Sequence, residues 1–185
     1  MGVAGLHAPG KSSTLFFKKG GVLVDGKLRN MTSVYILDGD RILLLYRVGS
    51  RVVSPSWCGI GGHFMPEELG DARACALREL EEESGLGEGD LLDLRLRYIT
   101  LRQKNGETRQ NYFFFARLRP GSTVPATSSE GQLRWFSLGE IAALPMPLTA
   151  GQMLAHYLHT GRHTRLLYGG ITTPEQLAVT PLEDF

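Results

Sequence analysis

The run Arg78-Glu79-Leu80-Glu81-Glu82-Glu83-Ser84-Gly85-Leu86 is the most informative stretch of this 185-residue chain. An α-helix turns by about 100° per residue, so Glu79, Glu82 and Glu83 cluster on one face while the leucines of the segment point roughly the other way. The run therefore predicts a helix with one apolar stripe for a core and one stripe of carboxylates.

A carboxylate stripe of this kind has two interpretations. Like charges at this spacing repel by a few tenths of a kcal/mol per pair, so the face gains nothing in an isolated helix. A divalent cation reverses the sign of that interaction, and hard oxygen ligands suit Mg²⁺ or Mn²⁺. Spacing alone leaves open whether the face holds a metal ion or is simply solvated.

The segment before the helix is rich in glycine. Gly61 and Gly62 lack a Cβ, so the backbone can come close to whatever lies on the acidic face, and a backbone carbonyl of this segment can complete a metal shell. An ordinary turn is the alternative for this pair. Asp71 is a good N-cap and Gly85 a good stop, which predicts a helix over residues 72–84.

The remaining segments predict an alternation of strands and helices. Asn105-Gly106 is the strongest short hairpin signal in the chain. Ser137 is expected to cap a short helix through Ala143, and Thr149 a second helix to Thr160. Strands are expected near residues 32–37, 42–46, 95–101, 112–118 and 133–136, with short edge strands at 166–168 and 177–179.

Composition narrows the class of protein. Lys and Arg total 20 against 19 Asp and Glu, so a net charge of +1 offers no global field for nucleic acid or an anionic membrane. The two cysteines lack CxxC spacing, no segment resembles a membrane span or signal peptide, and a cytoplasmic location is expected. We expect one domain over residues 29–185, preceded by an extension of uncertain order at residues 1–28.

The quoted run resembles the Nudix box, written G-x5-E-x7-R-E-U-x-E-E-x-G-U with U a bulky aliphatic residue. Its second half is matched completely, and Gly62 with Glu68 satisfies the opening G-x5-E. The loop is two residues longer than the pattern, because Gly70 holds the position expected for the first Glu. This leaves Glu67 and Glu68 as equally placed candidates. The likeness covers roughly residues 31–158.

The resemblance implies an α/β fold, an α/β/α sandwich with a mixed central sheet. It implies that Glu79, Glu82 and Glu83 carry Mg²⁺, for which Mn²⁺ can substitute, with the Gly61 carbonyl beside them. Arg78 would orient the carboxylates. The further candidates for phosphate or substrate contacts are Arg47, Arg51, Gly62, His63, Glu68 and Glu130.

The implied activity is metal-dependent hydrolysis of a pyrophosphate bond in a nucleoside triphosphate or another nucleoside diphosphate derivative. Signatures of the ADP-ribose, NADH and coenzyme A subfamilies are missing, which leaves a MutT-type enzyme and a substrate such as 8-oxo-dGTP as the default. Glu82 or Glu83 would help to activate the water. The expected partner is a small nucleotide, and the expected state is a monomer or homodimer. The aromatic candidates for stacking on a base are Tyr98, Tyr112, Phe114 and Trp135.

Three alternatives stay open from the sequence. The first is a Nudix-fold sensor or binding module without turnover, against which the complete carboxylate set argues. The second is an enzyme like isopentenyl diphosphate isomerase, which would use Cys58 or Cys75, although neither lies in a supporting motif. The third is a transition-metal site formed by His156, His159 and His163 near the end of a helix.

Overall fold

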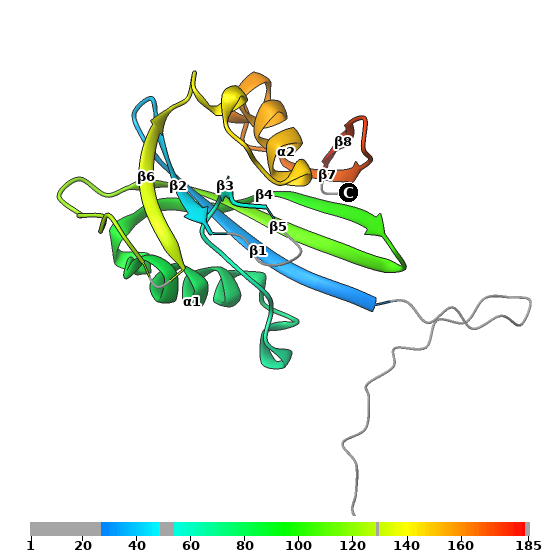
Figure 1. The fold of residues 1–185 in the computed structure, drawn as a ribbon, viewed down its shortest axis with the longest axis horizontal. Helices are drawn as coiled ribbons and strands as arrows, with labels where there is room; N and C mark the ends of the chain where they lie inside the picture. The colour runs from blue at the N-terminus through cyan, green and yellow to red at the C-terminus, as the bar shows by residue number, and fades with distance from the viewer. Residues whose placement is uncertain (1–26, 49–53, 129, 184–185) are drawn as a thin grey trace, which may run out of the picture.

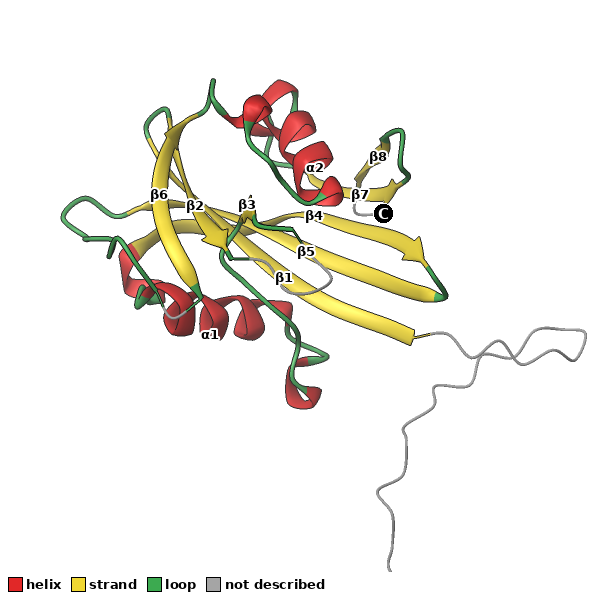
Figure 2. Ribbon diagram, in the orientation of Figure 1, coloured by secondary structure: helices red, strands yellow, loops and turns green. Residues whose placement is uncertain are grey.

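A computed structural model describes residues 27–48, 54–128 and 130–183. An eight-stranded mixed sheet lies between two α-helices, with α1 on one face and α2 on the other (Figures 1 and 2). This confirms the expected α/β sandwich. No helix in the described ranges is both long and apolar enough to cross a membrane.

The strands follow the order β3-β2-β1-β5-β4-β7-β8, and β6 (Gly131–Ser137) pairs with β2. β1 pairs in parallel with β5, and β4 with β7, whereas the other pairs are antiparallel, so the sheet is mixed. The other bounds are β1 Lys27–Asp38, β2 Arg41–Arg47, β3 Ser56–Cys58, β4 Leu91–Lys104, β5 Glu107–Leu118, β7 Leu167–Thr172 and β8 Leu177–Leu182.

Helix α1 (Ala72–Ser84) has the predicted bounds, because its signals are local. The Asp71 carboxylate accepts hydrogen bonds from the N–H groups of Arg73 and Ala74, each at 3.0 Å. Gly85 has a φ of 70°, the left-handed conformation that glycine adopts at low cost, and donates to the Glu81 carbonyl.

Other element predictions need correction. α2 spans Leu148–His159 and begins after Pro147, so Thr149 lies inside its first turn instead of capping it. The segment predicted as a helix from Ser137 is only a 3₁₀ turn, Ile141–Ala143, which starts after Glu140. Residues 169–170, expected to separate two edge strands, lie within β7.

The strand β3 was not predicted, and β1 begins at Lys27, inside the segment that the sequence assigned to the extension. The first 26 residues of that extension lie outside the described part of the chain. The two strands of the predicted hairpin are longer than their apolar runs, since the ladder continues to the turn at Asn105-Gly106.

Two apolar cores lie on opposite faces of the sheet. The core under α1 includes Val34, Ile36, Ala76 and Leu80, and the core under α2 includes Tyr35, Phe113, Phe115, Met153 and Tyr157. Successive strand residues point to opposite faces, so β1 and β5 supply both cores. Burial on both faces fixes the register of these central strands. The glycine-rich loop lies along one edge of β1, so the packing that positions β1 also positions this loop.

Candidate active site

The glycine-rich loop lies along the edge of β1 and is held there by backbone hydrogen bonds. The N–H of Thr32 donates to the Gly62 carbonyl at 2.9 Å, and the N–H of Phe64 donates to the Asn30 carbonyl at 3.2 Å. A Cβ at Gly61, whose φ is 150°, would lie 2.3 Å from the Thr32 carbonyl oxygen. Only glycine fits so close to the strand, which explains why the residue before the motif glycine Gly62 is also a glycine.

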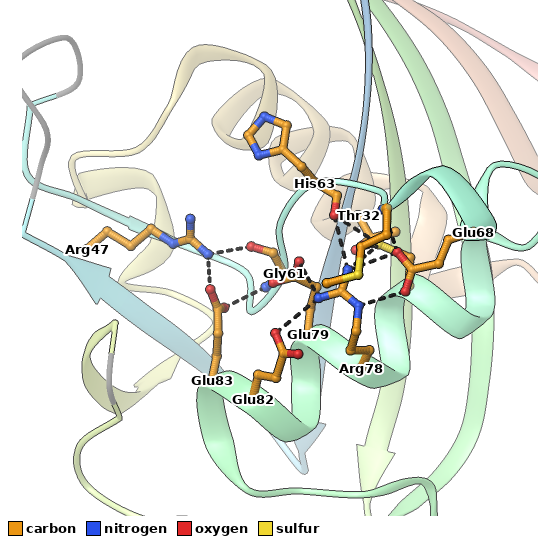
Figure 3. A network of polar contacts seen from close by, with 11 residues as sticks. Thr32, Arg47, Gly61, His63, Glu68, Arg78, Glu79, Glu82 and Glu83 are labelled. Carbon is orange, nitrogen blue, oxygen red and sulfur yellow. Dashed lines mark hydrogen bonds and ion pairs between the residues drawn. The ribbon is translucent and has the colours of Figure 1, made fainter. Parts of the chain in front are cut away.

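Glu83 reaches from α1 into this loop. Its side chain is buried, and its Oε2 accepts a hydrogen bond from the Gly61 N–H at 2.8 Å. Its Oε1 forms an ion pair with the guanidinium group of Arg47, which also donates to the Gly61 carbonyl (Figure 3). Burial raises the pKa of Glu83 to about 7, and the Arg47 charge and the Gly61 N–H oppose that rise.

Arg78 holds the other carboxylates together. Its Nε and Nη2 contact the two oxygens of Glu68 at 2.7 and 2.9 Å, which is a bidentate ion pair. Its Nη1 donates to Glu79 at 2.9 Å and to Glu82 at 3.0 Å (Figure 3). Nη2 also donates to the His63 carbonyl at 3.1 Å, so the same guanidinium ties α1 to the loop.

The structure distinguishes Glu68 from Glu67. Glu68 is buried, while Glu67 is exposed, and the hydrogen bonds from Arg78 lower the pKa of Glu68 to about 2. Met65 contributes a backbone hydrogen bond to Glu68 at 2.8 Å. The longer loop therefore still delivers a carboxylate to Arg78.

The three helix carboxylates do not converge on a single point in this conformation. Across residues 27–48, 54–128 and 130–183, no group of three or more His, Cys, Asp or Glu side chains is arranged to hold a metal ion. Glu79 and Glu82 are paired with Arg78, and Glu83 with Arg47. The transition-metal alternative also lacks such a group, and His156 instead makes a 2.8 Å hydrogen bond with the Tyr98 hydroxyl.

The chemistry of the donor set nevertheless fits a hard divalent cation. Glu79, Glu82, Glu83 and the Gly61 carbonyl offer only oxygen donors. Oε2 of Glu79 and Oε1 of Glu82 accept no hydrogen bond from any described residue. These two oxygens are free of hydrogen bonds from the described residues, and rotation of the side chains can turn them toward a cation. They are therefore the atoms that we expect to face a cation.

The weaker candidates fall into different places. Glu130 is exposed and precedes β6, which pairs with the end of β2 at Arg47, and its charge contributes to the raised pKa of Glu83. The His63 ring is exposed and lies apart from the carboxylates in Figure 3. Arg51 lies outside the described residues.

Two of the four aromatic candidates are wrong. Tyr98 and Phe114 are buried in the two cores and have no face free for a base. Tyr112 is partly exposed and packs against Phe64 with a 5.3 Å separation of ring centroids. Sequence reasoning missed Phe64, since a loop aromatic carries no periodic signal, and it missed Thr32, whose N–H holds the loop.

Comparison with known proteins places the fold. Residues 27–157 match the model of the NUDIX domain. No curated protein matches the sequence.

Solved structures with the same fold include a MutT protein from Bacillus halodurans, at 24% identity and a TM-score of 0.61, with 83% of this chain and 97% of that chain covered. A MutT protein from Methanosarcina mazei is 19% identical, with 73% and 96% covered and a TM-score of 0.60. An Ap4A hydrolase from C. elegans is 20% identical, with 75% and 99% covered and a TM-score of 0.58. With a domain match over most of its length and the box residues assembled as described, the chain belongs to the Nudix family and is a pyrophosphohydrolase acting on nucleoside diphosphate derivatives.

Proposed function

We propose that this protein hydrolyses nucleoside triphosphates to a monophosphate and pyrophosphate, with an oxidised purine nucleotide such as 8-oxo-dGTP as the first candidate substrate. The observation that carries the proposal is the packing of Glu79 and Glu83 against the backbone of Gly61 and Gly62. Nudix enzymes generally use divalent metals, and we propose Mg²⁺ here, with Mn²⁺ as a substitute. The MutT proteins among the solved structures share the fold, which agrees with a MutT-type enzyme.

We propose separate roles for the residues that would hold the metal and for the residue that would orient them. Glu79, Glu82, Glu83 and the Gly61 carbonyl would hold the metal, which supplies charge neutralisation of the phosphates and a lowered pKa for the attacking water. Arg78, fixed by Glu68, would orient Glu79 and Glu82.

We propose Arg47 and Glu130 as further contacts of the site, with Arg47 as the one that binds substrate phosphate oxygens. Arg47 carries a planar fork of donors at the end of β2, and Glu130 directly precedes Gly131 of β6, which pairs with Arg47. The partly exposed pair of Phe64 and Tyr112 offers an aromatic surface near the loop for the base. The proposed partner is thus a small nucleotide.

A substrate panel with Mg²⁺ tests this proposal. It contains common nucleoside triphosphates, 8-oxo-dGTP, ADP-ribose, diadenosine tetraphosphate, NADH and coenzyme A. We expect the highest kcat/KM for a nucleoside triphosphate, with monophosphate and pyrophosphate as products. Orthophosphate as the main product, or a higher kcat/KM for any non-triphosphate member, would overturn the assignment.

A further inference from the structure

A cavity of about 420 Å³ lies on the face of the sheet that α2 covers. The box helix α1 covers the other face of the sheet (Figure 1). Phe115 of β5 and Tyr157 of α2, stacked with ring centroids 3.8 Å apart, contribute to its walls. Both aromatic residues belong to the core under α2, so the cavity and the box are separated by the sheet. We call this the basic cavity, because five arginines line it: Arg95, Arg97, Arg117, Arg162 and Arg165.

These arginines face a single carboxylate in the cavity wall. Asp93 pairs with Arg95 and lies 3.6 Å from Arg165. Within the described residues, Arg97, Arg117 and Arg162 form no ion pair. The wall therefore carries an excess of positive charge in a chain whose overall net charge is only +1.

Arg97 is the most constrained of the five. It is 8% exposed, and its guanidinium donates only to neutral oxygens, namely the carbonyls of Gly161 at 2.9 Å, Thr164 at 3.0 Å and Leu166 at 3.0 Å, and more weakly the Thr164 hydroxyl. A buried cation without a counter-ion is costly, and an anion in the cavity would offset that cost. Its Nη1 makes no hydrogen bond with a described residue, which leaves a donor for such an anion.

Irregular backbone in β4 determines which of these side chains point toward the α2 layer. The register with β5 shifts between Leu92 and Arg95 and again between Leu96 and Tyr98. Asp93 adopts a φ of 60° in the first irregularity, and the second lets Arg97 and Tyr98, although adjacent, both face the α2 layer. Bulges that redirect side chains are common beside functional sites.

We propose that the basic cavity is a second ligand site, which binds a small molecule carrying two or more linked phosphate groups. Arginine suits this chemistry because its planar fork of donors matches phosphate oxygens. The volume falls within the range of roughly 300–1,000 Å³ that small-molecule pockets occupy. Arg95, Arg117, Arg162 and Arg165 are exposed, so a small anion can reach them from solvent. The volume of the cavity suits a small ligand better than a nucleic acid backbone.

The proposal is independent of the reaction at the box, and the test keeps the two apart. Calorimetric titration of inorganic pyrophosphate into the full-length protein is carried out in excess EDTA, so that no divalent metal can recruit phosphate to the carboxylates. We expect saturable binding to the wild type. The variant Arg117→Gln/Arg162→Gln removes two exposed, unpaired charges and should weaken the affinity by at least ~10-fold.

A matched variant controls for charge alone. Arg41→Gln/Arg134→Gln removes two exposed arginines from β2 and β6, outside the cavity, and should change the affinity by less than about twofold, because distant surface charges are screened. Melting curves verify that both variants fold. A nucleoside triphosphate serves as a second titrant: equal affinity supports a site that binds only the phosphates, and higher affinity supports one that also binds the organic part.

Three results would overturn the proposal. One is the absence of saturable pyrophosphate binding, and another is an equal loss of affinity in the cavity variant and its control. The third is tight binding of a single-stranded oligonucleotide that pyrophosphate does not displace, which would make the surface a nucleic acid site.

Discussion

A side chain at Gly62 would collide with the carboxylate of Glu79. An ideally placed Cβ lies 2.5 Å from Oε2 and 2.7 Å from Cδ of Glu79, much closer than any ordinary contact. The carboxylate of α1 and the backbone of the glycine-rich loop are thus packed against one another, and the position of each depends on the other.

Gly62→Ala should therefore displace Glu79 and lower kcat/KM by about 10²-fold, the scale expected when a group at the reacting centre moves by about 1 Å. The fold should survive, since the atoms that must shift belong to the end of a flexible side chain. Gly70→Ala is the matched control in the same loop, because its Cβ would meet no atom within 4 Å. Steady-state kinetics of both variants with Mg²⁺ check the prediction, and equal activities would refute it.

Glu68 should stabilise the protein above about pH 4.5 and lose that effect in acid. Its pKa falls from an ordinary value of 4.5 to about 2 in the folded state, mainly because Arg78 donates two hydrogen bonds to the carboxylate. A depressed pKa contributes stability that is present above the unfolded value and is lost as the pH falls toward the folded value.

Urea unfolding at pH values from 6 to 3 measures this effect. The free energy of unfolding of the wild type should fall more steeply below pH 4.5 than that of Glu68→Gln, which should also be less stable at pH 6. Glu67→Gln, at the exposed neighbouring position, should follow the wild type. Parallel pH profiles for the wild type and Glu68→Gln would show that the ion pair with Arg78 does not form in solution.

Arg47 and a metal ion should compete for the same oxygens. Arg47 contacts both the Gly61 carbonyl and the buried carboxylate of Glu83. Arg47→Gln leaves that carboxylate without its counter-ion, so the metal-free protein should melt at a lower temperature, and Mg²⁺ should raise its Tm by more than in the wild type. Arg41→Gln, which breaks an exposed ion pair with Asp38, should change neither quantity. If Arg47→Gln has the Tm and Mg²⁺ response of the wild type, Arg47 has no such role.

The sequence predicted best what is encoded locally. Helix α1 was placed correctly because Asp71, Gly85 and the helical period all act within a few residues. The choice between Glu67 and Glu68 was not local, because it depends on which carboxylate the loop brings to Arg78. The hydrogen bond between Thr32 and Gly62 joins positions 30 residues apart, and neither segment carries a local sequence signal that predicts it.

The aromatic side chains show the same limit. Alternation along a strand says which residues share a face, but not whether a helix covers that face. Tyr98 and Phe114 lie on opposite faces, and both faces are covered, so both residues are core. The prediction that Thr149 caps α2 is wrong because the helix already begins after Pro147, whose φ is −55°.

The most direct test of the carboxylate site compares Glu82→Gln with Glu81→Gln in turnover assays across a Mg²⁺ titration. Both residues are exposed on α1 and both changes remove one charge, but only Glu82 shares the face of Glu79 and Glu83 and contacts Arg78. The metal-free melting temperatures should differ little, because an exposed ion pair contributes at most about 1 kcal/mol. We predict that Glu82→Gln loses turnover by at least ~10²-fold at saturating Mg²⁺ while Glu81→Gln matches the wild type. Equal turnover and an equal Mg²⁺ dependence of the two variants would contradict the assignment of these carboxylates to a metal site.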